Sequence, residues 1–208
     1  MATQSTTPNP GTTRAFGTEL TPSVAESLAL IAAEGQGVIA ELVALADPSL
    51  DAAAARLRTA DRVFVLGAGR SGLALRMTAM RLMHLGLDVH VVGDVTTPAI
   101  AADDVLLVAS GSGTTGAIVR AAETAASTGA HIVAITTAPD SRLAELASVT
   151  IVIPAAQKTD HDGAISAQYS GGLFEQVVEL LGDALFHSLW QASGATADEL
   201  WPRHANLE

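Results

Sequence analysis

The stretch Val105-Leu-Leu-Val-Ala-Ser-Gly-Ser-Gly-Thr-Thr115 decides the fold. The apolar run from Val105 to Ala109 predicts a buried strand, and the apolar spacing of three or four residues after Thr115 predicts a helix. Six small residues with four hydroxyls and two glycines join them. Helix N-termini favour anions, and small residues let a ligand approach the backbone. The alternative is a capping turn without ligand, but one Ser or Thr would suffice for a cap. We therefore predict phosphate binding by Ser110, Gly111, Ser112, Gly113, Thr114 and Thr115.

A second glycine-rich loop, Gly67-Ala-Gly-Arg-Ser-Gly72, also lies between an expected strand and an expected helix. Its G-x-G-x-x-G pattern, with Asp94 following at the next strand, formally satisfies the dinucleotide fingerprint. A dinucleotide would not need the second loop at Ser110, and only five strands fit the chain, without a second domain for a hydride acceptor. A cation and a hydroxyl in the loop suit a compact sugar phosphate better. We predict that Gly69, Arg70 and Ser71 bind that substrate.

The remaining pattern predicts a three-layer α/β fold. Five apolar runs indicate strands at 62–66, 88–92, 105–109, 130–135 and 149–153. Nearly continuous apolar strands are typical of a parallel sheet covered by helices on both faces. We expect the flavodoxin-like strand order 2-1-3-4-5, with the ligand at the carboxyl ends of strands one and three. Helices are expected from about residue 21 to 47, over 50–59, 73–85 and 140–146, and from Leu173 to Leu189. Residues 1–20 are expected to form a disordered tail, and 21–208 a single domain.

Composition excludes several classes of function. The formal net charge of −11 argues against a nucleic-acid partner, because phosphate backbones are bound by clustered Lys and Arg. The chain has no cysteine and therefore no disulfide or thiolate metal site. No apolar run in the sequence approaches the ~20 residues of a membrane span. The N-terminus also lacks the layout of a signal peptide. We therefore expect a cytoplasmic protein with no membrane partner.

Several segments together resemble the sugar isomerase (SIS) domain, and more narrowly the 6-phospho-3-hexuloisomerase family of the ribulose monophosphate pathway. The two glycine loops carry the general SIS pattern. The narrower resemblance rests on Met80-Arg-Leu-Met-His-Leu-Gly86, Val92-Gly-Asp-Val-Thr-Thr-Pro98, Leu173-Phe-Glu-Gln176 and Arg203-His-Ala-Asn-Leu-Glu208. It covers the chain from about Thr21 to the end. The connection from Gln157 to Tyr169 does not align with the family.

The resemblance implies that 3-hexulose 6-phosphate is isomerised to fructose 6-phosphate during formaldehyde assimilation. The carbonyl moves between C3 and C2 through an enediolate, which requires a base and no cofactor. A carboxylate shielded from water can be that base. The resemblance implies this role for Glu175, which follows Ser170-Gly-Gly172 at the start of an apolar helix. Helix position alone would favour the simpler interpretation of a first-turn acid stabilised by the helix dipole.

His204 is the second residue to which the resemblance gives a catalytic role, in opening the sugar ring or in moving protons between oxygens. The alternative is a solvated tail histidine. A C-terminal tail can reach a neighbouring subunit, so we predict that His204 completes the site of another protomer. The apolar N-terminal helix and the helix from Leu173 to Leu189 also favour a homodimer or homotetramer.

Other interpretations remain open from the sequence. Another aldose–ketose phosphate isomerase would share the same loops. A non-catalytic phosphosugar sensor would need only the loops, although the first 60 residues carry no basic recognition helix. His161 lies between Asp160 and Asp162, which favours a solvated loop over a metal site. We expect no metal, and we expect His84, His90 and His131 to be structural.

Overall fold

The computed structural model describes residues 22–156, 166–169 and 171–207. At its centre is a five-stranded parallel sheet in the order β2-β1-β3-β4-β5, which confirms the predicted fold class and strand order. The strands are β1 (Val63–Gly67), β2 (Val89–Val91), β3 (Val105–Ala109), β4 (His131–Thr136) and β5 (Val149–Val152). Every residue of β3 is buried, as its uninterrupted apolar sequence predicts for a central strand.

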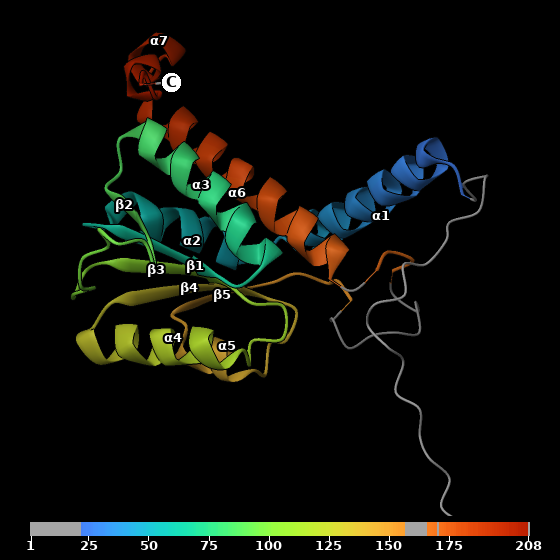
Figure 1. Cartoon of the computed structure of the whole chain (residues 1–208), viewed down its shortest axis with the longest axis horizontal. Coiled ribbons are helices and arrows are strands. Elements are labelled where there is room, and N and C mark those ends of the chain that lie inside the picture. The colour runs from blue at the N-terminus through green and yellow to red at the C-terminus, as the bar shows by residue number, and fades with distance from the viewer. Residues whose placement is uncertain (1–21, 157–165, 170, 208) are drawn as a thin grey trace, which may run out of the picture.

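Helices cover both faces of the sheet (Figure 1). One face carries α2 (Pro48–Thr59), α3 (Arg70–Leu85) and α6 (Gly172–Ser193), and the other carries α4 (Gly116–Thr128) and α5 (Arg142–Leu146). Two apolar clusters fill the spaces between these layers, with Leu57, Leu75 and Val178 in the first and Ile118 and Leu143 in the second. A short α7 (Ala197–Leu200) and a 3₁₀ turn (Trp201–Arg203) end the chain beside the last turn of α3.

Helix boundaries differ from the prediction where glycine sets them. α3 begins at Arg70 rather than Leu73, because Gly69 adopts φ +57° and turns the chain directly into the helix. α6 extends to Ser193 and ends at Gly194, which has a left-handed conformation. Apolar periodicity finds only the residues that face the core. It therefore underestimates the polar ends of helices.

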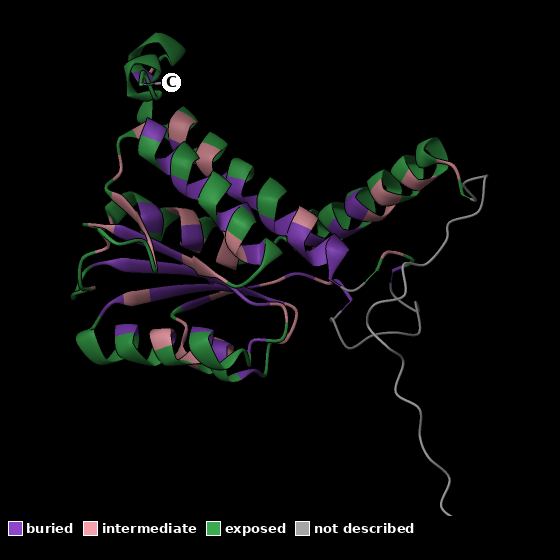
Figure 2. Cartoon of the chain, in the orientation of Figure 1, coloured by how far each residue is buried: buried purple, intermediate pink, exposed green. Residues whose placement is uncertain are grey.

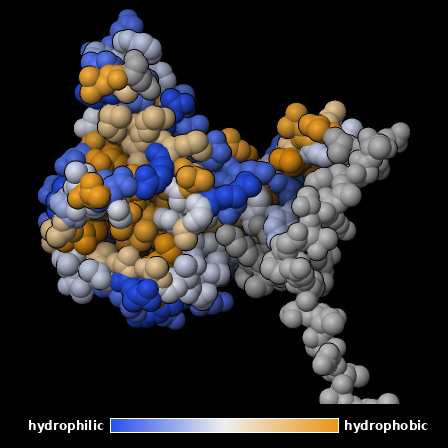
Figure 3. All heavy atoms as spheres, viewed as in Figure 1, coloured by the Kyte–Doolittle hydropathy of each residue, from blue (hydrophilic) through white to orange (hydrophobic). Residues whose placement is uncertain are grey.

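The helix α1 (Val24–Ala44) projects from the body of the molecule (Figure 1). Ser23 and Glu26 form a capping box at its start, and only Gly35, Val38 and Leu42 are buried. Figure 2 shows most of α1 as exposed, and Figure 3 shows apolar side chains gathered toward its N-terminal end. The exposed apolar residues of α1 include Val24, Leu28, Ile39 and Val43. None of the described parts of the chain covers this surface.

By length and composition α1 could cross a membrane, and its most apolar window has a mean hydropathy of 1.4. This finding corrects the expectation that no stretch of the chain is long and apolar enough to span a membrane. The spacing of Glu26, Glu34 and Glu41 hid the length of the apolar helix from a search for unbroken runs. Core helices of soluble proteins and signal sequences pass the same test. The hydrogen bonds of Glu34 to residues 166–168 tie α1 to the rest of the chain.

Candidate functional site

The loop after β1 contains three glycines for steric reasons. A Cβ atom on Gly67 would stand 2.7 Å from the backbone nitrogen of Gly72, and one on Gly72 would overlap the carbonyl oxygen of Gly67. The end of β1 and the start of α3 therefore touch through their backbones. Gly69, between them, is exposed and lies at the helix N-cap without any side-chain capping bond. Close packing of strand and helix thus accounts for the G-x-G-x-x-G spacing.

The acid that would complete a dinucleotide site is engaged elsewhere. Asp94 pairs with Arg76 of α3, with Nη2 of Arg76 2.8 Å from Oδ1 of Asp94. A ribose hydroxyl would have to compete with this ion pair for the carboxylate. The pairing favours the phosphosugar interpretation of the loop.

The loop after β3 is held in shape by its own hydrogen bonds. The hydroxyls of Ser110 and Thr115 lie 3.3 Å apart, and the backbone N–H of Gly113 donates to the carbonyl of Ser110 at 3.0 Å. Ser110 is buried, whereas Ser112, Thr114 and Thr115 are exposed. The carbonyl of Gly111 accepts hydrogen bonds from the hydroxyls of Thr136 and Thr137 in the neighbouring β4 segment. The exposed hydroxyls are therefore presented by a rigid loop.

Capping distinguishes the helices around these loops from those elsewhere. The helices α1, α2, α5 and α7 each begin with a side chain that accepts a bond from a first-turn N–H, namely Ser23, Asp47, Ser141 and Thr196. The helices α3, α4 and α6 have the N-cap residues Gly69, Thr115 and Gly171, none of which makes such a bond. Their first-turn N–H groups lack a capping side chain. An oxyanion could accept hydrogen bonds there.

Gly113 provides a test of the loop's geometry. It adopts φ +60°, and an added Cβ would overlap the side chain of Ser141. We expect Gly113→Ala to lower the free energy of unfolding by about 3 kcal/mol, from left-handed strain and steric overlap. Gly194 adopts φ +69° with open space around it, so Gly194→Ala is the matched control and should cost only about 1 kcal/mol. Urea unfolding measures both, and equal losses would contradict the packing described.

Glu175 lies where the uncapped starts of α3 and α6 meet. It is in the first turn of α6 and is only 4% exposed. Nε of Arg70, at the start of α3, is 2.6 Å from Oε2 of Glu175. The ring of the adjacent Phe174 would stand 3.6 Å from a Cβ on Gly111, so the start of α6 also touches the second glycine loop. A buried carboxylate, an exposed guanidinium and two glycine loops thus surround one point.

The ion pair between Arg70 and Glu175 gives the site its electrostatic character. The side chain of Arg70 remains 64% exposed to solvent while its Nε contacts the buried acid. A charged guanidinium at this position would attract a sugar oxygen that becomes negative during reaction. The site thus combines a candidate base with a candidate anion-stabilising cation.

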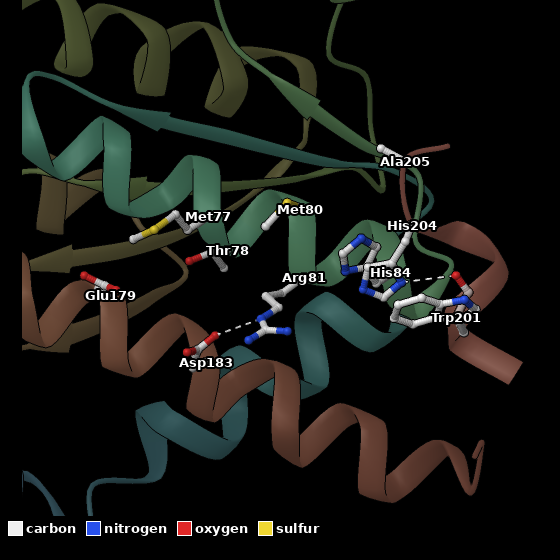
Figure 4. A pocket seen from close by; sticks show the side chains of 10 residues that line it. All are labelled: Met77, Thr78, Met80, Arg81, His84, Glu179, Asp183, Trp201, His204 and Ala205. Carbon is white, nitrogen blue, oxygen red and sulfur yellow. Dashed lines mark hydrogen bonds and ion pairs between the residues drawn. The ribbon is translucent and has the colours of Figure 1, made fainter. Parts of the chain in front are cut away.

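His204 lies at a different place, beside the last turn of α3 (Figure 4). Its ring is stacked on that of His84, with centroids 3.9 Å apart, and lies 4.7 Å from the ring of Trp201. Its Nδ1 is 3.1 Å from the carbonyl oxygen of Trp201. When Nδ1–H donates to that carbonyl, Nε2 is left as the acceptor. His204 is therefore exposed but held in one orientation, unlike a freely solvated tail residue.

The structure does not bring Glu175 and His204 together within one chain. Glu175 contacts Arg70 in the first turn of α3, whereas His204 stacks on His84 in the last turn of the same helix. About 21 Å of helix axis separates Arg70 from His84, given a rise of about 1.5 Å per residue. His204 instead borders a cavity of about 520 Å³ between α3 and α6, lined also by Met77, Arg81, Glu179 and Asp183. One chain in this conformation therefore does not place both residues in a single site.

Comparison with known proteins identifies the family. The SIS domain family matches residues 56–173. The chain belongs to the SIS-domain family. A protein named 3-hexulose-6-phosphate isomerase from Mycobacterium gastri is 60% identical over 82% of this chain and 86% of its own. One of the same name from Bacillus subtilis is 34% identical over 79% of this chain and 89% of its own.

A solved structure agrees with these relatives. A hypothetical protein from Methanococcus jannaschii, whose crystal structure was described as inferring 3-hexulose-6-phosphate isomerase function, superposes with a TM-score of 0.76 at 28% identity. The match covers 88% of this chain and 99% of that protein. The resemblance predicted from the sequence motifs is therefore confirmed.

His84, expected to be structural, stacks on His204 from the last turn of α3. It is buried in this SIS protein, and its pKa is lowered by burial, by the neighbouring His204 and by Arg81. The folded state thus keeps His84 neutral, whereas the unfolded chain takes up a proton below about pH 6.5. Stability that depends on neutral His84 is present above that pH. This contribution to stability is lost as the pH falls through the lowered pKa that His84 has in the folded state.

We expect acid to weaken the stacking that holds His204. Urea unfolding measures how much the free energy of unfolding falls between pH 7.5 and pH 5.5. This fall should be smaller for His84→Gln than for the wild-type protein. His187→Gln, which removes an exposed histidine of α6, should lose as much as the wild type. Equal losses in all three proteins would contradict the assignment to His84.

Some expectations fall outside the described residues. The connection with Lys158, Asp160, His161 and Asp162 lies there, so its suggested solvated loop is not tested. Within residues 22–156, 166–169 and 171–207, no group of three His, Asp or Glu side chains is arranged to hold a metal ion.

Sequence reasoning missed the contacts that join the parts of the site. It placed Arg70 in a substrate loop and Glu175 on a helix, but not against each other. Ser71, also predicted to bind substrate, is only 4% exposed and lies beneath the loop surface. A ligand could reach it only by sitting directly on the first turn of α3. No local sequence pattern predicts these contacts, because they depend on how α3 packs against α6.

Proposed function

We propose that this SIS-domain protein is a 3-hexulose-6-phosphate isomerase that interconverts 3-hexulose 6-phosphate and fructose 6-phosphate. The observation that carries the proposal is the buried carboxylate of Glu175 against Arg70, where two glycine loops and the uncapped starts of α3 and α6 converge. The names of the relatives at 60% and 34% identity support the choice of substrate. The reaction belongs to formaldehyde assimilation, and we expect it to take place in the cytoplasm.

The chemistry is a proton transfer between adjacent carbons. Glu175 removes the proton from C2 of 3-hexulose 6-phosphate, and the electron pair moves to form an enediolate with negative charge on the oxygen of C3. Glu175 then returns the proton to C3, and the hydroxyl proton of O2 moves to O3, which leaves the carbonyl at C2. Arg70 stabilises the negative oxygen, because its guanidinium lies beside the base.

The substrate phosphate binds at the loop after β3. Ser112, Thr114 and Thr115 offer exposed hydroxyls there, and the first turn of α4 offers N–H groups without a capping side chain. Gly69, Arg70 and the first turn of α3 hold the sugar from the opposite side. The rigid bonding of the loop through Thr136 and Thr137 fixes the phosphate relative to Glu175.

His204 acts in the site of a neighbouring subunit in this proposal. Two observations support a homodimer or homotetramer with shared sites. Glu175 and His204 are far apart along α3 in one chain, and His204 is exposed although it is held by Trp201 and His84. An apolar groove of about 440 Å³ between α1 and α6, lined by Ile31, Ile39 and Leu180, gives the subunits a surface to bury.

The test of this function is a coupled assay. Fructose 6-phosphate is supplied with a 3-hexulose-6-phosphate synthase, and formaldehyde is measured. Formaldehyde release that depends on this protein supports the proposal. Binding of fructose 6-phosphate without formaldehyde release would favour a phosphosugar sensor. Conversion of an aldose phosphate without formaldehyde release would favour another isomerase of the same fold.

A further inference from the structure

Glu34 is a half-buried carboxylate on α1 that has no role in the proposed reaction. Its side chain accepts three hydrogen bonds from a segment more than a hundred residues away. The hydroxyl of Ser166 donates to Oε2 at 2.7 Å, the backbone N–H of Ala167 donates to Oε1 at 2.8 Å, and Nε2 of Gln168 donates to Oε2 at 2.9 Å. Both carboxylate oxygens are thus engaged by one short segment.

The same segment is bonded to the helix that carries Glu175. Oε1 of Gln168 accepts a hydrogen bond of 2.8 Å from Nε2 of Gln176, the residue that follows Glu175. The backbone N–H of Gly172 donates to the carbonyl of Tyr169 at 3.3 Å. The side-chain amide of Gln168 therefore donates to Glu34 through its nitrogen and accepts from Gln176, near the start of α6, through its oxygen.

The electrostatics favour an ionised Glu34. Burial raises its pKa, but the bonds from Ala167, Ser166 and Gln168 together leave the pKa below its usual value. An ionised carboxylate accepts on both oxygens, which the three donors require. A neutral acid or an amide would place a donor against one of them.

We propose that Glu34 is a positioning residue for the proton-transfer base: it holds the segment Ser166–Gln168 and, through Gln168 and Gln176, fixes the first turn of α6 that carries Glu175. The inference rests on the proposed role of Glu175. It adds that α1, whose outer face is exposed and apolar, is coupled to the active site through the carboxylate of Glu34 as well as through its packing on α6. An arrangement of this kind makes catalysis depend on how α1 is packed.

The test compares Glu34→Gln with Glu41→Gln, an exposed glutamate two turns further along the same helix. For Glu34→Gln we expect kcat to fall about 10-fold or more, because small displacements of a reacting group slow proton transfer. The KM for fructose 6-phosphate should stay within about twofold, since the phosphate loops are not contacted. Glu41→Gln should match the wild type. Gln168→Ala should resemble Glu34→Gln, and the double variant should be no slower than either single variant.

A purely structural role would lower the unfolding temperature of Glu34→Gln without changing kcat in the folded protein, and this result would overturn the inference. Hydrogen exchange gives a second readout that needs no activity. The amides of residues 172–176 should exchange at least about 10-fold faster in Glu34→Gln than in the wild type and in Glu41→Gln. Unchanged exchange would overturn the positioning role even with an inactive wild type. An inactive wild type with accelerated exchange would instead refute only the proposed isomerase reaction.

Discussion

Replacing Glu175 by glutamine is expected to lower kcat for isomerisation about 10³-fold, within the range that positioned acid–base groups contribute. The amide has nearly the same shape as the carboxylate but cannot take a proton from carbon. Glu175 is 4% exposed, so water cannot readily replace it as the base. The coupled formaldehyde assay measures the effect. Because the phosphate loops are unchanged, KM should change by less than about threefold.

The control for this prediction is Glu41→Gln, which makes the same chemical change at an exposed site on α1. Thermal unfolding should show that both variants are folded at the assay temperature. A loss of less than about tenfold in Glu175→Gln would mean that another group is the base, given the size of general-base effects. The site would then have to be rebuilt around a residue other than Glu175.

Mixing two inactive variants should restore activity. His204→Ala lacks the histidine and Glu175→Gln lacks the base, so each homo-oligomer has only defective sites. If a site combines Glu175 of one subunit with His204 of its neighbour, a mixed pair contains one intact site. Random mixing in equal amounts should then recover about a quarter of the wild-type activity, because half of the pairs are mixed and half of their sites are intact.

The experiment requires subunit exchange, which co-expression of two differently tagged chains provides. Purification on both tags isolates the mixed oligomers, and their recovered activity should rise to about half of wild type in a pair of subunits. Absence of recovery in doubly purified oligomers would show that each site is made from one chain. His204 would then have to act by a route other than a neighbouring subunit, or have no part in the reaction.

The topology and the two glycine loops could be predicted from the sequence because they depend on local patterns. The run from Val105 to Ala109 is apolar at every position, as expected for a strand that helices cover on both faces. Gly113 and Gly69 follow such strands, and both adopt the left-handed conformations for which glycine is suited. These features need no knowledge of distant residues.

The contacts within the site could not be predicted because they join elements that are distant in the chain. The pair Arg70–Glu175 depends on the register between α3 and α6, where Gly182 lets α6 approach Thr78 closely. The hydrogen bonds of Glu34 to the segment before α6 depend in the same way on how α1 lies against the body. The apolar face of α1 was predicted as a helical stripe, but its exposure appears only when the chain is folded.

The most direct measurement of the central claim is the position at which deuterium enters fructose 6-phosphate. The protein is incubated with fructose 6-phosphate in D₂O, and the sugar is examined by proton NMR. Proton transfer between C2 and C3 predicts loss of the proton signal at C3 with retention of both protons at C1, and Glu175→Gln should show no loss. Exchange at C1 with retention at C3 would identify an aldose–ketose isomerase. Exchange at neither carbon, with no 3-hexulose 6-phosphate formed, would contradict proton transfer by this protein.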